Sequence, residues 1–180
     1  PVKIQPDIIP AGQALSGADM ELNQTGKEYR LQEAIEPIRG SYDYIIIDTP
    51  PSLGILTVNA LTASDSVIIP AQADIFSLQG IGQLYNTVEV VRKYCNPSIT
   101  INGILLTRYS LRSVLSRDMT ELIADTARQL DTFVYQAVIR EGIAVKEAQA
   151  QRTDIFTYAP KSNAAADYMA FVNEMLKGRR

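Results

Sequence analysis

The stretch YDYIIIDTPPSLG, residues 42–54, decides the fold of this chain. Its three consecutive isoleucines give residues 44–48 the continuous apolar character of a strand that is buried on both faces. Asp48 is the first polar residue at the carboxyl end of that strand, and the double proline that follows prevents an immediate turn into a helix. The stretch therefore predicts a buried central strand that brings a carboxylate and an extended loop to a ligand crevice.

Similar runs of strand length occur along the whole chain and alternate with helical patterns. The other strand-like runs are residues 7–11, 66–70, 99–107 and 132–139. The helical segments are residues 14–24, 27–38, 54–63, 77–95, 111–130, 142–150 and 163–177. This alternation predicts an α/β fold, a doubly wound and mostly parallel sheet with helices on both faces. No Gly/Ser linker or repeat points to a second domain, so we expect residues 1–180 to form a single α/β domain.

Composition excludes several classes of site. With 180 residues, 46% of them hydrophobic, the chain can bury a full core. No apolar stretch approaches the roughly 20 residues that a membrane-spanning helix needs, and the start lacks a signal-peptide pattern, so we expect a cytoplasmic protein. Cys95 is the only cysteine and histidine is absent, which excludes an intramolecular disulfide, a CxxC redox pair and a cysteine-rich metal site.

Charge is distributed unevenly along the chain. Residues 1–90 hold 4 Lys and Arg against 11 Asp and Glu, whereas residues 91–180 hold 13 against 9. Such asymmetry can mark a basic surface for a polyanion on a protein that is acidic overall. Solvated helix faces with a chance imbalance are the alternative interpretation.

An apolar run that ends in Asp has the form of the Walker B strand, whose carboxylate helps to hold Mg²⁺ beside the phosphates of a nucleotide. The pattern alone has a simpler explanation, because many α/β strands end in an acid that only caps the next helix.

Several blocks in order extend the match. YDYIIIDTPPSLG, LTVNALTASDSVIIPAQADIFSLQGIGQL and GILLTRY, with DIIPAGQALSGADMEL upstream and VIREGIAVKEAQAQRTDIFTYAPKSNAAADY downstream, resemble the ParA/Soj family of partitioning ATPases, relatives of MinD. The resemblance covers residues 7–176. It implies a P-loop NTPase fold, ATP and Mg²⁺ as cofactors, an ATP-bound homodimer, non-specific DNA binding, a ParB-like partner that stimulates hydrolysis, and a nucleoid-associated protein.

The phosphate-binding half of such a site is not found in the sequence. Neither GxxxxGK[ST] nor the family's deviant form KGGVGKT occurs, and Gly26-Lys27 is followed by Glu28. In the family this loop lies upstream of the segment that matches residue 7. We therefore expect the chain to be the carboxyl-terminal piece of a longer ATPase, or one whose gap another strand closes, and to hydrolyse no ATP alone. A missing neighbour would also leave ladder groups of residues 44–48 orphaned, at about 1 to 3 kcal/mol each.

The resemblance assigns roles to individual residues. Asp48 is the Walker B acid, which acts on Mg²⁺ through water. The loop that begins at Thr49 and Pro50 and ends at Gly54 senses the γ-phosphate. Two stretches of this chain match the family segments that flank the adenine. The first is Thr107 and Arg108, and the second is Ile139, Arg140, Glu141 and Gly142. The family often reads Ile-Pro-Arg where this chain reads Ile-Arg-Glu, so a solvated helix start is the alternative for Arg140 and Glu141.

The resemblance also implies a basic DNA-binding surface. Arg112 aligns with one family arginine, Lys146 can replace another, and four further residues can add to the patch: Arg92, Lys93, Arg117 and Arg152. Phosphate contacts need charge and reach but read no base edges, so they tolerate such shifts. Ordinary solvated charge is the alternative for each of these four residues.

Two other functions remain open. One is a non-catalytic module that binds DNA or a partner without a nucleotide cycle. The other is a MinD-like membrane-positioning ATPase, in which the final helix would lie on a membrane surface. Core packing is the favoured interpretation of that helix, because Asp167 and Glu174 dilute its basic face.

Overall fold

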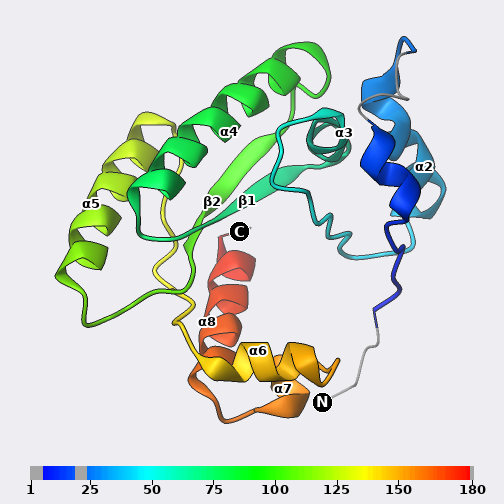
Figure 1. The fold of residues 1–180 in the computed structure, drawn as a ribbon. Coiled ribbons are helices and arrows are strands. Elements are labelled where there is room, and N and C mark those ends of the chain that lie inside the picture. The colour runs from blue at the N-terminus through cyan, green and yellow to red at the C-terminus, as the bar shows by residue number, and fades with distance from the viewer. Residues whose placement is uncertain (1–5, 19–23, 179–180) are drawn as a thin grey trace. The chain divides into compact units, whose positions relative to one another are not determined.

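The structure of the protein is a computed structural model that describes residues 6–18 and 24–178. The chain divides into two compact units, Pro1–Ser64 and Asp65–Arg180 (Figure 1). The expectation of a single domain stays a prediction. Residues 19–23 of the predicted helix 14–24 lie outside the described residues.

A parallel sheet forms the centre of the second unit. Strand β1 (Ser66–Ala71) pairs with β2 (Thr100–Leu106), and helix α4 (Ile75–Tyr94) connects them in the manner of a βαβ unit. The strands predicted at 66–70 and 99–107 are therefore confirmed. Asp74 begins α4 because its carboxylate accepts a hydrogen bond from the Ser77 nitrogen at 2.7 Å.

Helices cover both faces of this sheet. On one face, alternate strand residues such as Ile69 and Ile104 pack against α4 and against α5 (Val114–Gln129). On the other face, Leu105 packs with residues of α8 (Asn163–Lys177). This period-two alternation between two helical layers confirms the predicted α/β class, and Figure 1 shows α5 and α8 on different sides of the strands.

The ladder between β1 and β2 contains one extra residue in β2. Val67 pairs with Ile101 and Ile69 pairs with Ile104, so three steps in β2 match two in β1. Gly103 lies in this bulge with φ +107°, a backbone conformation that residues with a side chain rarely adopt. A Cβ atom at this position would lie 2.6 Å from Cε2 of Tyr135, so the aromatic ring can approach only because residue 103 is glycine.

The run at 132–139 is not the regular strand that the sequence predicts. It follows β2 in parallel, but only through isolated bridges, Ile104 to Val134 and Tyr109 to Arg140. The regular ladder is lost between these bridges, where residues 136–138 leave the strand pattern. We call residues 132–140 the edge segment. Beyond it lie the short helices α6 (Ile143–Ala150) and α7 (Ile155–Tyr158).

The first unit contains the 3₁₀ turns η1 (Gln13–Gly17) and η2 (Lys27–Tyr29) and the helices α2 (Arg30–Arg39) and α3 (Ile55–Ala63). Asn59 joins them, since it is 4% exposed and its side chain is fully used. Its Oδ1 accepts from the Leu31 nitrogen at 3.0 Å, and its Nδ2 donates to the carbonyls of Lys27 and Ile55, both at 2.9 Å.

The prediction of a buried strand at residues 44–48 is wrong. These residues are extended but belong to no strand, and Ile46 is 91% exposed. The strand predicted at 7–11 is likewise absent, although Tyr42 donates a hydrogen bond to Asp7 at 2.6 Å. The physical reason is that a strand needs a ladder partner, and the only sheet among the described residues is formed by β1 and β2.

Candidate functional site

Two loops meet at the carboxyl end of the parallel sheet. The Tyr109 nitrogen donates to the Ile139 carbonyl at 3.0 Å, and the Glu141 nitrogen donates to the Tyr109 carbonyl at 3.3 Å. Thr107 is anchored to the end of β1, because its nitrogen donates to the Ala71 carbonyl at 2.8 Å. The structure thus brings together the two groups that the sequence analysis placed at the adenine. In parallel α/β sheets this end is where ligands bind.

The tips of the two loops are linked by charge. Arg108 has φ +49°, and its Nη2 lies 3.2 Å from Oε1 of Glu141. Both side chains are more than half exposed, so this ion pair contributes little to stability. Both groups remain within reach of a ligand at the surface.

Arg140 is held by a carboxylate of α8. Its backbone nitrogen donates to Asp167 at 3.0 Å, and its Nη2 donates to the same carboxylate at 2.6 Å. Partial burial by itself raises the pKa of Asp167, but the hydrogen bonds and charge of Arg140 outweigh this and lower that pKa below its ordinary value. The guanidinium therefore faces α8, and its predicted part in nucleotide binding stays a prediction.

Asp48, Thr49 and Pro50 lie in the first unit, in the extended segment that leads to α3. All three are exposed, and within the described residues the Asp48 carboxylate has no hydrogen-bond or ion-pair partner. No group of three or more Asp, Glu, His or Cys residues in the described parts of the chain could hold a metal. A lone solvated carboxylate fits Mg²⁺ only as a partial ligand, because Mg²⁺ keeps several waters and shares the phosphates of its nucleotide.

The four predicted DNA-binding residues are exposed basic side chains of the second unit. Arg112 and Arg117 lie before and within the first turns of α5, Lys146 lies on α6, and Arg152 follows α6. In the part of the chain that the structure describes, none of them forms an ion pair, in contrast to Arg128, which pairs with Asp125. Their positive charge is therefore available to solvent and to a polyanion.

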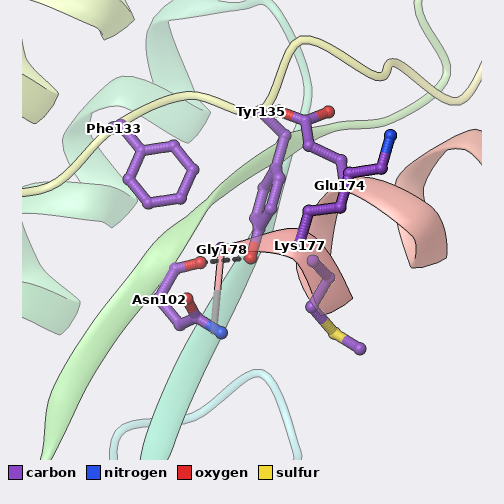
Figure 2. A pocket seen from close by; sticks show the side chains of 7 residues that line it. Asn102, Phe133, Tyr135, Glu174, Lys177 and Gly178 are labelled. Carbon is purple, nitrogen blue, oxygen red and sulfur yellow. Dashed lines mark hydrogen bonds between the residues drawn. The ribbon is translucent and has the colours of Figure 1, made fainter. Parts of the chain in front are cut away.

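A pocket of about 390 Å³ lies at a different place, beside the early residues of β2. Figure 2 shows its lining, with the Tyr135 hydroxyl donating to the Asn102 carbonyl and with Glu174 and Lys177 projecting from α8. None of the predicted site residues lines it.

The role of two acids on α8 was not predicted from the sequence. Asp167 and Glu174 were expected only to dilute a basic helix face, yet both accept hydrogen bonds from the edge segment. Their spacing of seven residues, which places them on one helix face, was the available signal.

The fold and the similarity to known sequences define the class of protein to which this chain belongs. The family described as AAA domain matches residues 2–101, more than half of the chain, and the chain belongs to it. The sporulation initiation inhibitor Soj of Bacillus subtilis is 42% identical over 170 residues, which cover 94% of this chain and 66% of that protein. The chromosome partitioning protein ParA of Caulobacter vibrioides is 40% identical over 177 residues, covering 97% of this chain and 65% of that protein. Within the wider class, this chain is a member of the ParA/Soj family, and it spans about two thirds of these relatives.

Solved structures share the fold of this chain. Apo McdA of Cyanothece superposes with a TM-score of 0.81 at 23% identity, covering 93% of this chain and 67% of that one, which supports the fold alone. Cobyrinic acid a,c-diamide synthase of Mycobacterium smegmatis, solved with an ATP analogue and magnesium, superposes with a TM-score of 0.61 at 41% identity. That match covers 64% of this chain and 47% of the synthase. The structure contains no helix, among its described residues, that is long and apolar enough to cross a membrane.

Proposed function

We propose that the chain belongs to an ATP-dependent DNA-partitioning protein. In this proposal Thr107, Arg108 and residues 139–142 flank the adenine, and Asp48 acts on Mg²⁺ through water next to the phosphates. The observation that carries it is the junction of the two loops at the carboxyl end of the sheet, Tyr109 with Ile139 and Arg108 with Glu141. The magnesium-bound and nucleotide-bound synthase gives it independent support.

The chemistry would be attack of water on the γ-phosphate. Positioning and charge neutralisation supply most of the rate in such phosphoryl transfers, and a bound Mg²⁺ would neutralise developing charge. This chain contributes the exposed Asp48 carboxylate and the loop after it, but its sequence has no glycine-rich lysine loop to hold the phosphates. We therefore propose that residues 1–180 alone hydrolyse no ATP.

The proposal extends to partners. ATP would drive homodimerisation, the dimer would bind DNA without sequence preference through Arg112, Arg117, Lys146 and Arg152, and a ParB-like protein would stimulate hydrolysis. Such binding would place the protein on the nucleoid. These four basic side chains are exposed and form no ion pair with any other described residue, which supports a contact with phosphates.

ATP hydrolysis by the protein expressed from its whole reading frame tests the catalytic part. Asp48→Ala should lower kcat by about ten- to a hundredfold, because the hydrated Mg²⁺ would lose the carboxylate that orients it through water. Asp43→Ala removes another exposed carboxylate from the same stretch and should leave kcat within about twofold. Equal activity in both variants would overturn the role of Asp48.

A second candidate is a DNA-binding or partner-binding module without a nucleotide cycle. The four exposed basic side chains, which form no ion pair within the described residues, favour it. The two candidates differ in one measurement, since a module would bind DNA equally well with and without ATP, whereas the ATPase would bind DNA more tightly with ATP.

A further inference from the structure

Between Tyr135 and Ile139 the edge segment contains two residues more than the matching stretch of β2. The Tyr135 nitrogen donates to the Ile104 carbonyl at 2.9 Å, and the next bond of this kind runs from the Ile139 nitrogen to the Leu106 carbonyl at 2.8 Å. Four steps along the edge segment thus match two steps along β2, whereas a regular parallel ladder advances equally on both strands. The chain must bulge between Tyr135 and Ile139.

Glu174 holds this bulge from α8. Its Oε1 accepts from the Gln136 nitrogen and its Oε2 from the Ala137 nitrogen, both at 2.8 Å. One carboxylate therefore satisfies two consecutive N–H groups that the ladder does not use. Hydrogen bonds to a charged acceptor are stronger than those between neutral groups, so the bulge has a defined conformation.

Asp167 holds the other end of the same stretch. It lies seven residues before Glu174, almost two helical turns, and so on the same face of α8. Its carboxylate accepts hydrogen bonds from the backbone nitrogen of Arg140 and from Nε and Nη2 of the guanidinium. With its side chain only 11% exposed, Asp167 is a fixed anchor. One helix face thus fixes both ends of residues 136–140, and the loop at 140–142 begins at the second anchor.

We propose that Glu174 and Asp167 are positioning residues that give the site its selectivity for adenine over guanine nucleotides. The inference rests on the proposed function. Adenine and guanine present opposite donor and acceptor patterns on their six-membered rings, so a backbone loop distinguishes them only if its N–H and C=O groups are held in place. The extra residues between Tyr135 and Ile139 determine the position of the loop at residues 140–142. The carboxylates of Glu174 and Asp167 determine the conformation of the bulge. The guanidinium of Arg140 acts through Asp167.

Selectivity is measured on the protein expressed from its whole reading frame, with fluorescent ATP and GTP analogues and Mg²⁺. Glu174→Gln and Asp167→Asn should each raise the Kd for ATP about tenfold, the effect of losing one good hydrogen bond, while the Kd for GTP changes less than about twofold. The controls are Glu121→Gln and Asp118→Asn, the same chemical changes at exposed positions of α5. In parallel, hydrogen exchange of the amides at 136, 137 and 140 reports the anchors themselves and should accelerate in the variant that removes each anchor.

The outcomes separate the two proposals. Reduced discrimination between ATP and GTP together with faster exchange at these amides supports the positioning role. Faster exchange with unchanged discrimination overturns the positioning role, because the acids would then be merely structural. A wild-type protein that binds neither nucleotide overturns the proposed function, and the positioning role with it.

Discussion

Arg140 and Asp167 form a two-pronged ion pair in which both Nε and Nη2 of the guanidinium donate to one carboxylate, at 2.9 and 2.6 Å. The same carboxylate also accepts from the backbone of Arg140, so side chain and main chain are fixed together. A planar guanidinium suits this geometry, and lysine could not reproduce it. The pair attaches the loop after the edge segment to α8.

Loss of the Asp167 charge should make the thermal stability of the protein less sensitive to a fall in pH. The folded-state pKa of Asp167 is lowered, so its contribution is complete above the ordinary pKa and is lost as the pH falls through the lowered value. Asp167→Asn should lower the Tm by roughly 2 to 4 °C at pH 7, and the difference from wild type should shrink below about pH 4. Thermal melts from pH 7 to pH 2 measure this, with Asp118→Asn as control. A difference that stays constant down to pH 2 would contradict the prediction.

Gly103→Ala should destabilise the second unit. The new Cβ would lie 2.6 Å from the Tyr135 ring and would force an unfavourable positive φ, which together cost about 1 to 3 kcal/mol. Gly80→Ala is the matched control, because that position in α4 is open within 4 Å and alanine favours a helix. Urea denaturation measures both variants, and a stable Gly103→Ala protein would show that the bulge can relax.

Asn59→Ala should destabilise the first unit. The change leaves the Leu31 nitrogen and the Lys27 carbonyl without their partner, at a cost of about 1 to 3 kcal/mol. Asn86→Ala removes an exposed asparagine from α4 and should change the free energy of unfolding by less than about 0.5 kcal/mol. If chemical denaturation gave equal effects for the two variants, Asn59 would not be the centre of this unit.

Arg112→Ala and Arg117→Ala should weaken DNA binding without changing sequence preference. Each lost phosphate contact should lower the slope of log K against log salt by about one. Arg128→Ala serves as control, since that arginine lies at the far end of α5 and pairs with Asp125. Fluorescence anisotropy with two unrelated duplexes measures the effect, and a loss confined to one duplex would speak against phosphate contacts.

The sequence predicted the regular part of the fold because that part depends on local pattern. The runs at 66–70 and 99–107 pair with each other, and a helix of the expected length joins them. The run at 44–48 has the same apolar character but no ladder partner among the described residues, and pairing cannot be read from composition. The bulge after Tyr135 depends on the Glu174 carboxylate, a contact across 37 residues that no local pattern reveals.

The site was predicted in part for a similar reason. The position of Thr107 and Arg108 at the end of β2 follows from the strand itself. Two ion pairs depend instead on how three separate segments pack. They are the pair between Arg108 and Glu141 and the pair between Arg140 and Asp167. The roles of these residues toward a nucleotide stay predictions.

The anchoring of the edge segment has a consequence for the behaviour of the protein at high concentration. An unprotected sheet margin attracts strands from other molecules, and aggregates begin at such margins. Here the N–H groups of Gln136, Ala137 and Arg140 already donate to carboxylates of α8. An incoming chain would have to displace two acids before it could add a strand, so the same contacts that shape the loop also discourage self-association along this side.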